Sequence, residues 1–382
     1  MTNEKLKWHF HFLDIFLIFV PVSILFYFLH VASLLSFLMT AAALVGMAHL
    51  MAEATSIIAN HVSSTISALI NATFGNAVEL MIAIFSLRAG LFALVTASIT
   101  GSILINVLLL IGLAMLSGGL KYKEQKFNKD SAGLSSTMLF VAVIGLGLPS
   151  MYKMIQGTPS REMSLAVSII LGIVYILSLI YTLVTHRHMF VVERQAPEEN
   201  HDRWSTKGAV IILLIITLLA GFESNFLVNT IEPLVGKTGF TDAFVGLVFI
   251  AILTNIPEIT SSMAFARKNH MTLSLEIGMS SALQIALFVA PILILVSPLV
   301  VSGGYNLVFT PFELVAVVVT AMIANYVGSD GICHWVEGAQ LIAVYLLVAT
   351  AFYFLLDICI ISVYFIQYYT MVVPGVYKRG SL

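Results

Sequence analysis

Long apolar stretches alternate with short polar segments along almost the whole chain. An α-helix needs roughly 20 apolar residues to cross a bilayer, and these stretches approach or exceed that length. The pattern predicts eleven spans, at 11–29, 32–52, 66–88, 91–117, 132–150, 163–185, 207–229, 243–267, 272–299, 311–328 and 338–357. A membrane β-barrel would show alternation with a period of two residues, and the chain has no such pattern.

The composition agrees with this interpretation. Hydrophobic residues make up 59% of the 382 residues and charged residues only 10%, whereas about a quarter of the residues in a soluble domain are charged. Cys333 and Cys359 are the only cysteines, too few for a disulfide framework or a structural zinc site. No basic patch with interleaved aromatic residues indicates nucleic-acid binding. We therefore expect an all-α integral membrane protein.

A polar segment between the sixth and seventh predicted spans divides the chain and is typical of a linker. The first apolar run lacks a small-residue cleavage site, so we expect a retained helix and not a signal peptide. The predicted organisation is an N-terminal helix at 1–31, a five-helix repeat at 32–185, a polar cytoplasmic linker at 186–206, a second five-helix repeat at 207–357 and an apolar tail at 358–382. The tail is short for a span, which leaves three alternatives: it extends the last helix, lies in the interface or crosses the membrane.

The two halves match one another at an offset of 179 positions (258 less 79). The matched pairs are Asn76 with Asn255, Glu79 with Glu258, Arg88 with Arg267, Leu94 with Leu273, Ser102 with Ser281, Leu104 with Leu283 and Leu108 with Leu287. Leucine matches arise easily by chance, so the Asn and Glu pairs carry most of the weight. Because five spans is an odd number, the two copies must enter the membrane in opposite senses. This is the inverted-topology repeat of many secondary transporters.

The distribution of basic residues predicts the orientation. Twelve Lys and Arg residues fall on the N-terminal side of the predicted spans and six on the other side. By the positive-inside rule, the N-terminus is expected in the cytoplasm. The short loops suit the plasma membrane of a prokaryote.

The matched Asn and Glu residues are the candidate site. Asn76 and Glu79 are three residues apart, as are Asn255 and Glu258, so each pair presents its oxygens on one helix face. Two carboxylates near the bilayer midplane are costly unless a cation or protons neutralise them. Ca²⁺ fits, because it takes six to eight oxygen ligands and Mg²⁺ gives up its water reluctantly. Structural carboxylates that hydrogen-bond between helices are the alternative.

Residues that loosen or line the helices complete the candidate site. Pro257 lacks the N–H that would bond the Leu253 carbonyl, and Gly75 weakens the first helix at the corresponding level, so freed carbonyls become available as ligands. We expect a larger bend in the second copy, because Val78 stands opposite Pro257. Neighbouring spans add polar groups that either pack the helices or orient the glutamates: Ser102, Asn106, Ser280, Ser281 and Gln284.

The segments NATFGNAVELMIAIFSLRAG and ASITGSILINVLLLIG resemble the first repeat of the calcium/cation-proton antiporters, the CAX family. The second half continues the resemblance with LSLEIGMSSALQIALFVAP, FTPFELVAVVVTAMIANYVGSDG and WVEGAQLIAVYLLVATAFYF, so that it covers about residues 32–357. The resemblance implies an eleven-helix fold with two inverted repeats and exchange of cations for protons. It also implies that a glutamate in each repeat motif forms the shared site. By position these are Glu79 and Glu258, supported by Asn76, Asn255, Ser102, Asn106, Ser281 and Gln284.

The second motif departs from the family pattern. Where the family usually reads Gly-Asn-Ala-Ala-Glu-His, this chain reads TNIPEI, with Thr254, Pro257 and Ile259, and Ala282 stands where a second Ser is common. Thr and Pro before the glutamate are similar to the motifs of the sodium/calcium exchangers in the same superfamily. Sodium/calcium exchange is therefore the alternative function.

We expect a transporter and not an enzyme. Ca²⁺ and H⁺ would compete for Glu79 and Glu258 during alternating access, and Mn²⁺ is a further candidate cation. A hydrolytic membrane enzyme would need a zinc motif or paired aspartates, and the predicted spans contain neither. The expected partners are the transported ions and the lipid bilayer, with a homo-oligomer as a compatible assembly. No resident cofactor is expected, since Ca²⁺ is the substrate.

Overall fold

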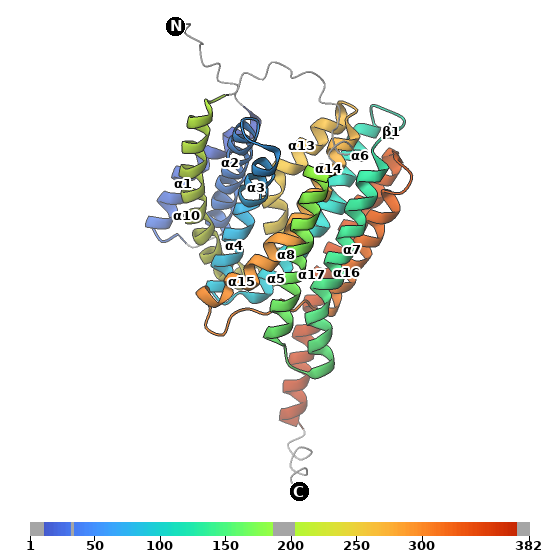
Figure 1. Ribbon diagram of the computed structural model, residues 1–382. Coiled ribbons are helices and arrows are strands. Elements are labelled where there is room, and N and C mark those ends of the chain that lie inside the picture. The colour runs from blue at the N-terminus through green and yellow to red at the C-terminus, as the bar shows by residue number, and fades with distance from the viewer. Residues whose placement is uncertain (1–10, 32–33, 186–202, 373–382) are drawn as a thin grey trace.

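The computed structural model describes residues 11–31, 34–185 and 203–372 as a bundle of long helices (Figure 1). The described part of the chain begins at one end of the bundle and α17 finishes at the other, and we name these ends the N-terminal and C-terminal faces. A short antiparallel pair of strands, β1 (Gln125–Lys126) and β2 (Ile332–Cys333), lies at the N-terminal face.

The helices follow the predicted apolar stretches closely. Those before residue 186 are η1 (Phe12–Ile18), α1 (Phe19–Phe28), α2 (Leu34–Ala59), α3 (Ser64–Phe74), α4 (Ala77–Arg88), α5 (Phe92–Leu104), η2 (Ile105–Leu110), α6 (Ile111–Gly119), α7 (Lys129–Gln156), α8 (Arg161–Ile180) and η3 (Tyr181–Thr185). Those after residue 202 are α10 (Thr206–Thr238), α11 (Asp242–Phe244), η4 (Val245–Ile250), α12 (Ala251–Thr254), α13 (Ile256–Arg267), α14 (Met271–Gln284), η5 (Ile285–Val289), α15 (Ala290–Val300), α16 (Pro311–Val327) and α17 (Trp335–Val372).

The helices confirm the prediction of a multi-pass helical membrane protein. Among the described residues, seven helices are long and apolar enough to cross a bilayer, or eight if Asp242–Thr254 and Ile256–Arg267, which meet at 53°, count as one span. Two shorter apolar helical segments are Phe12–Phe28 and Pro311–Val327. The predicted number of eleven spans stays a prediction.

Two predictions concern the linker and the tail. Most of the predicted linker, residues 186–202, lies outside the described residues. Helix α17 continues without a break to Val372 and so includes the first part of the predicted tail, whereas its place relative to the membrane stays a prediction. Residues 373–382 lie outside the described residues.

Two of the apolar stretches are interrupted at matching asparagines. The helix is broken between α3 and α4 at Gly75 and Asn76, and between α12 and α13 at Asn255. Pro257 lies in the first turn of α13, where a backbone N–H has no partner inside the helix, so it starts this helix without losing a hydrogen bond. Both breaks therefore fall at the asparagine, whether or not a proline follows.

The backbone repeats at the same offset as the sequence. Helices α4 and α13 each have 12 residues and begin directly after Asn76 and Asn255. Each is followed by a residue of positive φ, Gly90 at 78° and Asn269 at 66°. Farther on, the π-helical turns η2 and η5 interrupt corresponding spans. The two halves thus share backbone irregularities as well as residues.

The helices around these breaks pack closely. Helix α2 lies against α10, and α10 also contacts α4. Helix α5 crosses η4 at two glycines, where a Cβ on Gly101 would collide with the Leu247 carbonyl and one on Gly246 would lie 2.6 Å from the Leu94 carbonyl. Backbone contact at this crossing therefore depends on the missing side chains.

Candidate cation-binding site

The two matched glutamates occupy equivalent places on broken helices. Glu79 is the third residue of α4, and Glu258 is the third residue of α13. Both glutamates lie in the first turn of a helix, where backbone N–H groups have no acceptor inside the helix. The partial positive charge of a helix N-terminus favours a carboxylate there. Breaking the helices at Asn76 and Asn255 thus places two stabilised carboxylates inside the apolar bundle.

No basic side chain in the described part of the chain forms an ion pair with these carboxylates. Among residues 11–31, 34–185 and 203–372, the ion pairs involve other side chains, and none includes Glu79 or Glu258. The Glu258 carboxylate lies close enough to that of Glu79 for like-charge repulsion. One oxygen of Glu258, Oε2, is buried without a hydrogen-bond partner in the described part of the chain. The pair is therefore an uncompensated negative site.

Asn255 and Asn106 join the two halves of the chain. Asn106, on η2, donates through Nδ2 to Asn255 Oδ1 at 2.8 Å and to Ser281 Oγ at 2.9 Å. Asn255 in turn donates through its own Nδ2 to the Ala251 carbonyl at 2.8 Å, the Thr254 hydroxyl at 3.3 Å and the Ser102 hydroxyl at 3.4 Å. Asn106 Oδ1 is buried and has no partner among the described residues. The network fixes both amides and leaves one carbonyl oxygen open.

A second link runs through Asn76. Its Nδ2 donates to Gln284 Oε1 at 2.5 Å, and the Nε2 of Gln284 donates to Ser280 Oγ at 3.2 Å. Asn76 therefore keeps its Oδ1 as the acceptor atom. The breaks in the helices add main-chain acceptors, because the last carbonyls of α3 and α12 have no continuing helix to bond.

A cavity of about 550 Å³ reaches this group of side chains. Its wall includes Glu258, Asn76, Gly75, Ser281 and Gln284 together with Ser131 at the start of α7 and Glu276 on α14. Since α7 begins at the N-terminal face, the cavity extends toward that face (Figure 1). Glu79, Ser102 and Thr254 instead line a cavity of about 10 Å³. The two glutamates thus adjoin cavities of very different size.

The residues that the sequence predicts for the site lie at or beside the breaks. Gly75 and Pro257 shape the backbone, and a Cβ on Gly75 would lie 2.5 Å from the Asn71 carbonyl. The sequence interpretation did not place Glu276 or Ser131 in the site, although they line the large cavity and Ser131 donates to Glu276 at 3.1 Å. Glu276 lies one turn after the start of α14, where it resembles a solvated charge at a span end.

Known proteins resemble this chain along most of its length. The family model described as "Sodium/calcium exchanger protein" matches residues 32–184 and 208–354. A protein of Aphanothece halophytica named Ca(2+)/H(+) antiporter is 39% identical, over 88% of this chain and 95% of its own. The Ca(2+)/H(+) antiporter ChaA of Bacillus subtilis is 37% identical, over 88% of this chain and 97% of its own.

Solved structures agree with the sequence matches. The structure of native YfkE has a TM-score of 0.77 at 34% identity and covers 89% of this chain and 99% of its own. The crystal structure of the H+/Ca2+ exchanger CAX, at 18% identity, shares the fold with a TM-score of 0.67 over 94% of this chain and 95% of its own. The chain therefore belongs to the calcium/cation-proton antiporter family within the sodium/calcium exchangers, a family of transporters and not of enzymes.

Proposed function

We propose that this protein exchanges Ca²⁺ for H⁺ across a membrane by alternating access, with Glu79 and Glu258 as the shared site. The observation that carries the proposal is the uncompensated pair of carboxylates, one of which, Glu258, lines a cavity of about 550 Å³. The printed names of the relatives, Ca(2+)/H(+) antiporters, support the choice of ions. Mn²⁺ is a further candidate cation, because oxygen donors also suit it.

The donor set suits Ca²⁺. The two carboxylates match its charge, and Glu258 Oε2 and Asn106 Oδ1 are buried oxygens without other partners among the described residues. Asn76 Oδ1 and the terminal carbonyls of α3 and α12 supply further oxygens toward the six to eight that Ca²⁺ takes. No nitrogen or sulfur ligand is needed.

Protons compete for the same carboxylates. Protonation removes the negative charge that attracts Ca²⁺ and also the repulsion between the two side chains. Two glutamates accept up to two protons, which equals the charge of one Ca²⁺. Exchange then follows under two conditions. Protonation of the glutamates must release Ca²⁺, and access to the site must change from one face to the other only while Ca²⁺ or protons neutralise the carboxylates.

The architecture we propose has eleven spans: an N-terminal helix at 1–31 and inverted repeats at 32–185 and 207–357. The equal lengths of α4 and α13, the positive φ of Gly90 and Asn269, and the matching turns η2 and η5 support the repeat. The excess of Lys and Arg at the N-terminal face favours a cytoplasmic N-terminus, in the plasma membrane of a prokaryote.

Alternating access follows from the unequal cavities. The large cavity extends from Glu258 toward the N-terminal face, whereas Glu79 adjoins only about 10 Å³ of space. This arrangement suits a state that is open on one side. Rocking of one group of helices against the other would open the opposite side, as in other inverted-repeat transporters.

The coupling ion can be tested in liposomes that contain the purified protein. We expect Ca²⁺ uptake to follow an imposed pH gradient and to stay at background under an Na⁺ gradient at constant pH. A Ca²⁺ indicator inside the vesicles measures both, and vesicles with the Glu79→Gln/Glu258→Gln protein report leakage. Uptake that follows Na⁺ at constant pH would favour the alternative function, sodium/calcium exchange.

The amide network gives a second test. Asn106→Ala removes the donor to Asn255 and Ser281, so we expect proton-driven Ca²⁺ uptake to fall by about 10- to 100-fold, the usual range for residues that orient metal ligands. Ser117→Ala is the control, since this hydroxyl donates only to the Ala114 carbonyl of its own helix in the described contacts. Equal rates in the two variants would show that the network has no orienting role.

A further inference from the structure

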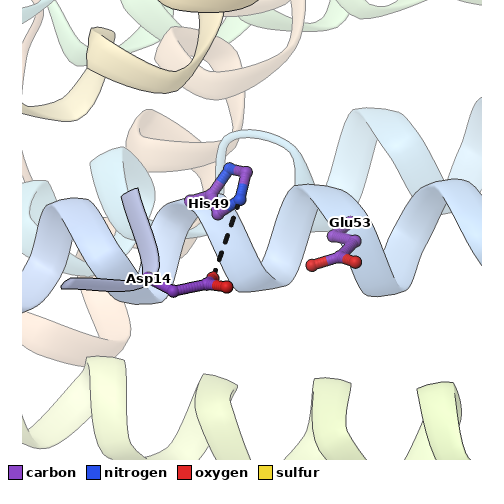
Figure 2. A group of neighbouring side chains, drawn as sticks. All are labelled: Asp14, His49 and Glu53. Atoms are coloured by element: carbon purple, nitrogen blue, oxygen red, sulfur yellow. Dashed lines mark ion pairs between the residues drawn. The ribbon is translucent and has the colours of Figure 1, made fainter. Parts of the chain in front are cut away.

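A second group of charged side chains lies at the N-terminal face, on segments that do not contribute to the glutamate pair. Asp14 is on η1, His49 and Glu53 are one turn apart on α2, and Arg203 precedes α10. We name these four residues the Asp14 cluster. Figure 2 shows His49 and Asp14 facing one another, with Glu53 farther along the same helix as His49.

Arg203 binds one side of the Asp14 cluster. Its Nη1 lies 2.9 Å from Asp14 Oδ2 and 3.1 Å from Glu53 Oε2. The His11 backbone N–H also donates to Asp14 Oδ2, at 3.0 Å. Both donors therefore contact the same oxygen of Asp14, Oδ2, and neither contacts the other oxygen, Oδ1.

That other oxygen is buried and lacks a hydrogen bond. The Asp14 side chain is only 3% exposed, and its Oδ1 has no hydrogen-bond partner in the described part of the chain. His49 Nε2 is buried as well and has no such partner there. The two atoms lie 3.8 Å apart, too far for a hydrogen bond. A cation between this carboxylate oxygen and this imidazole nitrogen would satisfy both atoms, and unsatisfied buried polar atoms are costly.

The spacing of these atoms fits an ion after a small adjustment. One ligand atom each from Asp14, His49 and Glu53 can be chosen so that all lie within 4.8 Å of one another. Three ligand atoms held at about 2.1 Å in a tetrahedral arrangement around one ion lie roughly 3.4 Å apart. The side chains would therefore move toward one another by up to about 1 Å on binding. The His11 ring stacks on that of His49, with centroids 4.3 Å apart, and holds the imidazole in place.

We propose that Asp14, His49 and Glu53 form a binding site for a divalent transition-metal ion of the Mn²⁺ or Zn²⁺ kind, separate from the transport site. Two carboxylates and an imidazole nitrogen are donors that such ions accept, whereas Ca²⁺ takes oxygen ligands. Two carboxylates with one guanidinium leave the cluster one negative charge when His49 is neutral, which favours a cation. A bound ion would tie η1 to α2 beside the start of α10.

The site can be measured by Mn²⁺ binding to the full-length protein with its affinity tag removed. The Glu79→Gln/Glu258→Gln background eliminates the transport carboxylates, so failure of the proposed function does not affect the result. We expect one bound Mn²⁺ by electron paramagnetic resonance, with affinity at least about tenfold weaker after His49→Gln. His61→Gln, an exposed histidine near the end of the same helix, should bind as tightly as the background protein.

Pulsed resonance of the bound Mn²⁺ provides a test that needs no variant of the cluster. We expect coupling to a histidine ¹⁴N nucleus, and displacement of Mn²⁺ by Zn²⁺ but not by an equal concentration of Ca²⁺. If a variant does not fold, the same ¹⁴N-coupling measurement on the wild-type protein tests the proposal, with excess Ca²⁺ added to occupy the transport site. The proposal is overturned by the absence of ¹⁴N coupling, by equal affinity after His49→Gln, or by Ca²⁺ displacing Mn²⁺ as readily as Zn²⁺ does.

Discussion

Replacing Glu258 by Gln is expected to eliminate most proton-driven Ca²⁺ uptake, and Glu79→Gln is expected to do the same. Each change removes one of two negative charges inside the helix bundle and a proton-binding group while keeping the size of the side chain. Removing the anionic partner of a desolvated cation costs about 2 to 5 kcal/mol, which corresponds to roughly 30- to 4,000-fold in binding. Vesicles loaded with a Ca²⁺ indicator and driven by a pH gradient measure the loss.

The matched control for the glutamate variants is Glu162→Gln. Glu162 lies in the first turn of α8 and is fully exposed to solvent, so the same chemical change there should leave uptake unchanged. Gel filtration of each variant separates loss of exchange from loss of folded protein. Uptake within twofold of the wild-type rate in a folded Glu258→Gln or Glu79→Gln protein would refute the proposed site.

Gly101→Val is expected to destabilise the protein more than any other single glycine change at a helix crossing. A Cβ at this position would collide with the main chain of η4 at Leu247, and the backbone there cannot turn aside as a flexible side chain can. Overpacking costs about 1 to 3 kcal/mol where side chains relax, and we expect roughly 3 kcal/mol or more here. The apparent unfolding temperature of the purified protein in detergent measures the effect.

Gly172→Val on α8 is the control for the glycine variant. Apart from the backbone of its own helix, no atom of the described residues lies within 4 Å of the position that its Cβ would occupy, so we expect unchanged or slightly raised stability. Similar unfolding temperatures for the Gly101 and Gly172 variants would show that α5 and η4 can separate at little cost.

The helices were predictable because crossing a bilayer requires a long apolar run, and nearly every long apolar run in this chain forms a helix. The breaks were only partly predictable. Gly75 lies in the first break, beside Asn76, whereas the second break is at Asn255 and not at Pro257, because a side-chain amide held in a polar network competes with regular helix geometry.

The Asp14 cluster shows what the sequence could not indicate. Asp14, Glu53 and Arg203 each lie near the end of an apolar run, where most charges are solvated, and no regular spacing connects them. Their contacts arise only when η1, α2 and the start of α10 assemble. The same holds for Glu276, which resembles a surface charge until the cavity beside it is known.

The π-helical turn η2 constrains the length of the chain between two contacts. Asn106 lies in this turn and bonds Asn255, whereas Gly112, just beyond it, packs against the backbone of α17 at Gly338. A π turn holds about one residue more than an α turn, and each residue rotates a helix by about 100°. Loss of one residue from η2 would therefore keep the apolar composition of the span but turn Gly112 away from Gly338. We therefore expect that the protein does not tolerate insertions or deletions in this turn, even at positions where it tolerates substitutions.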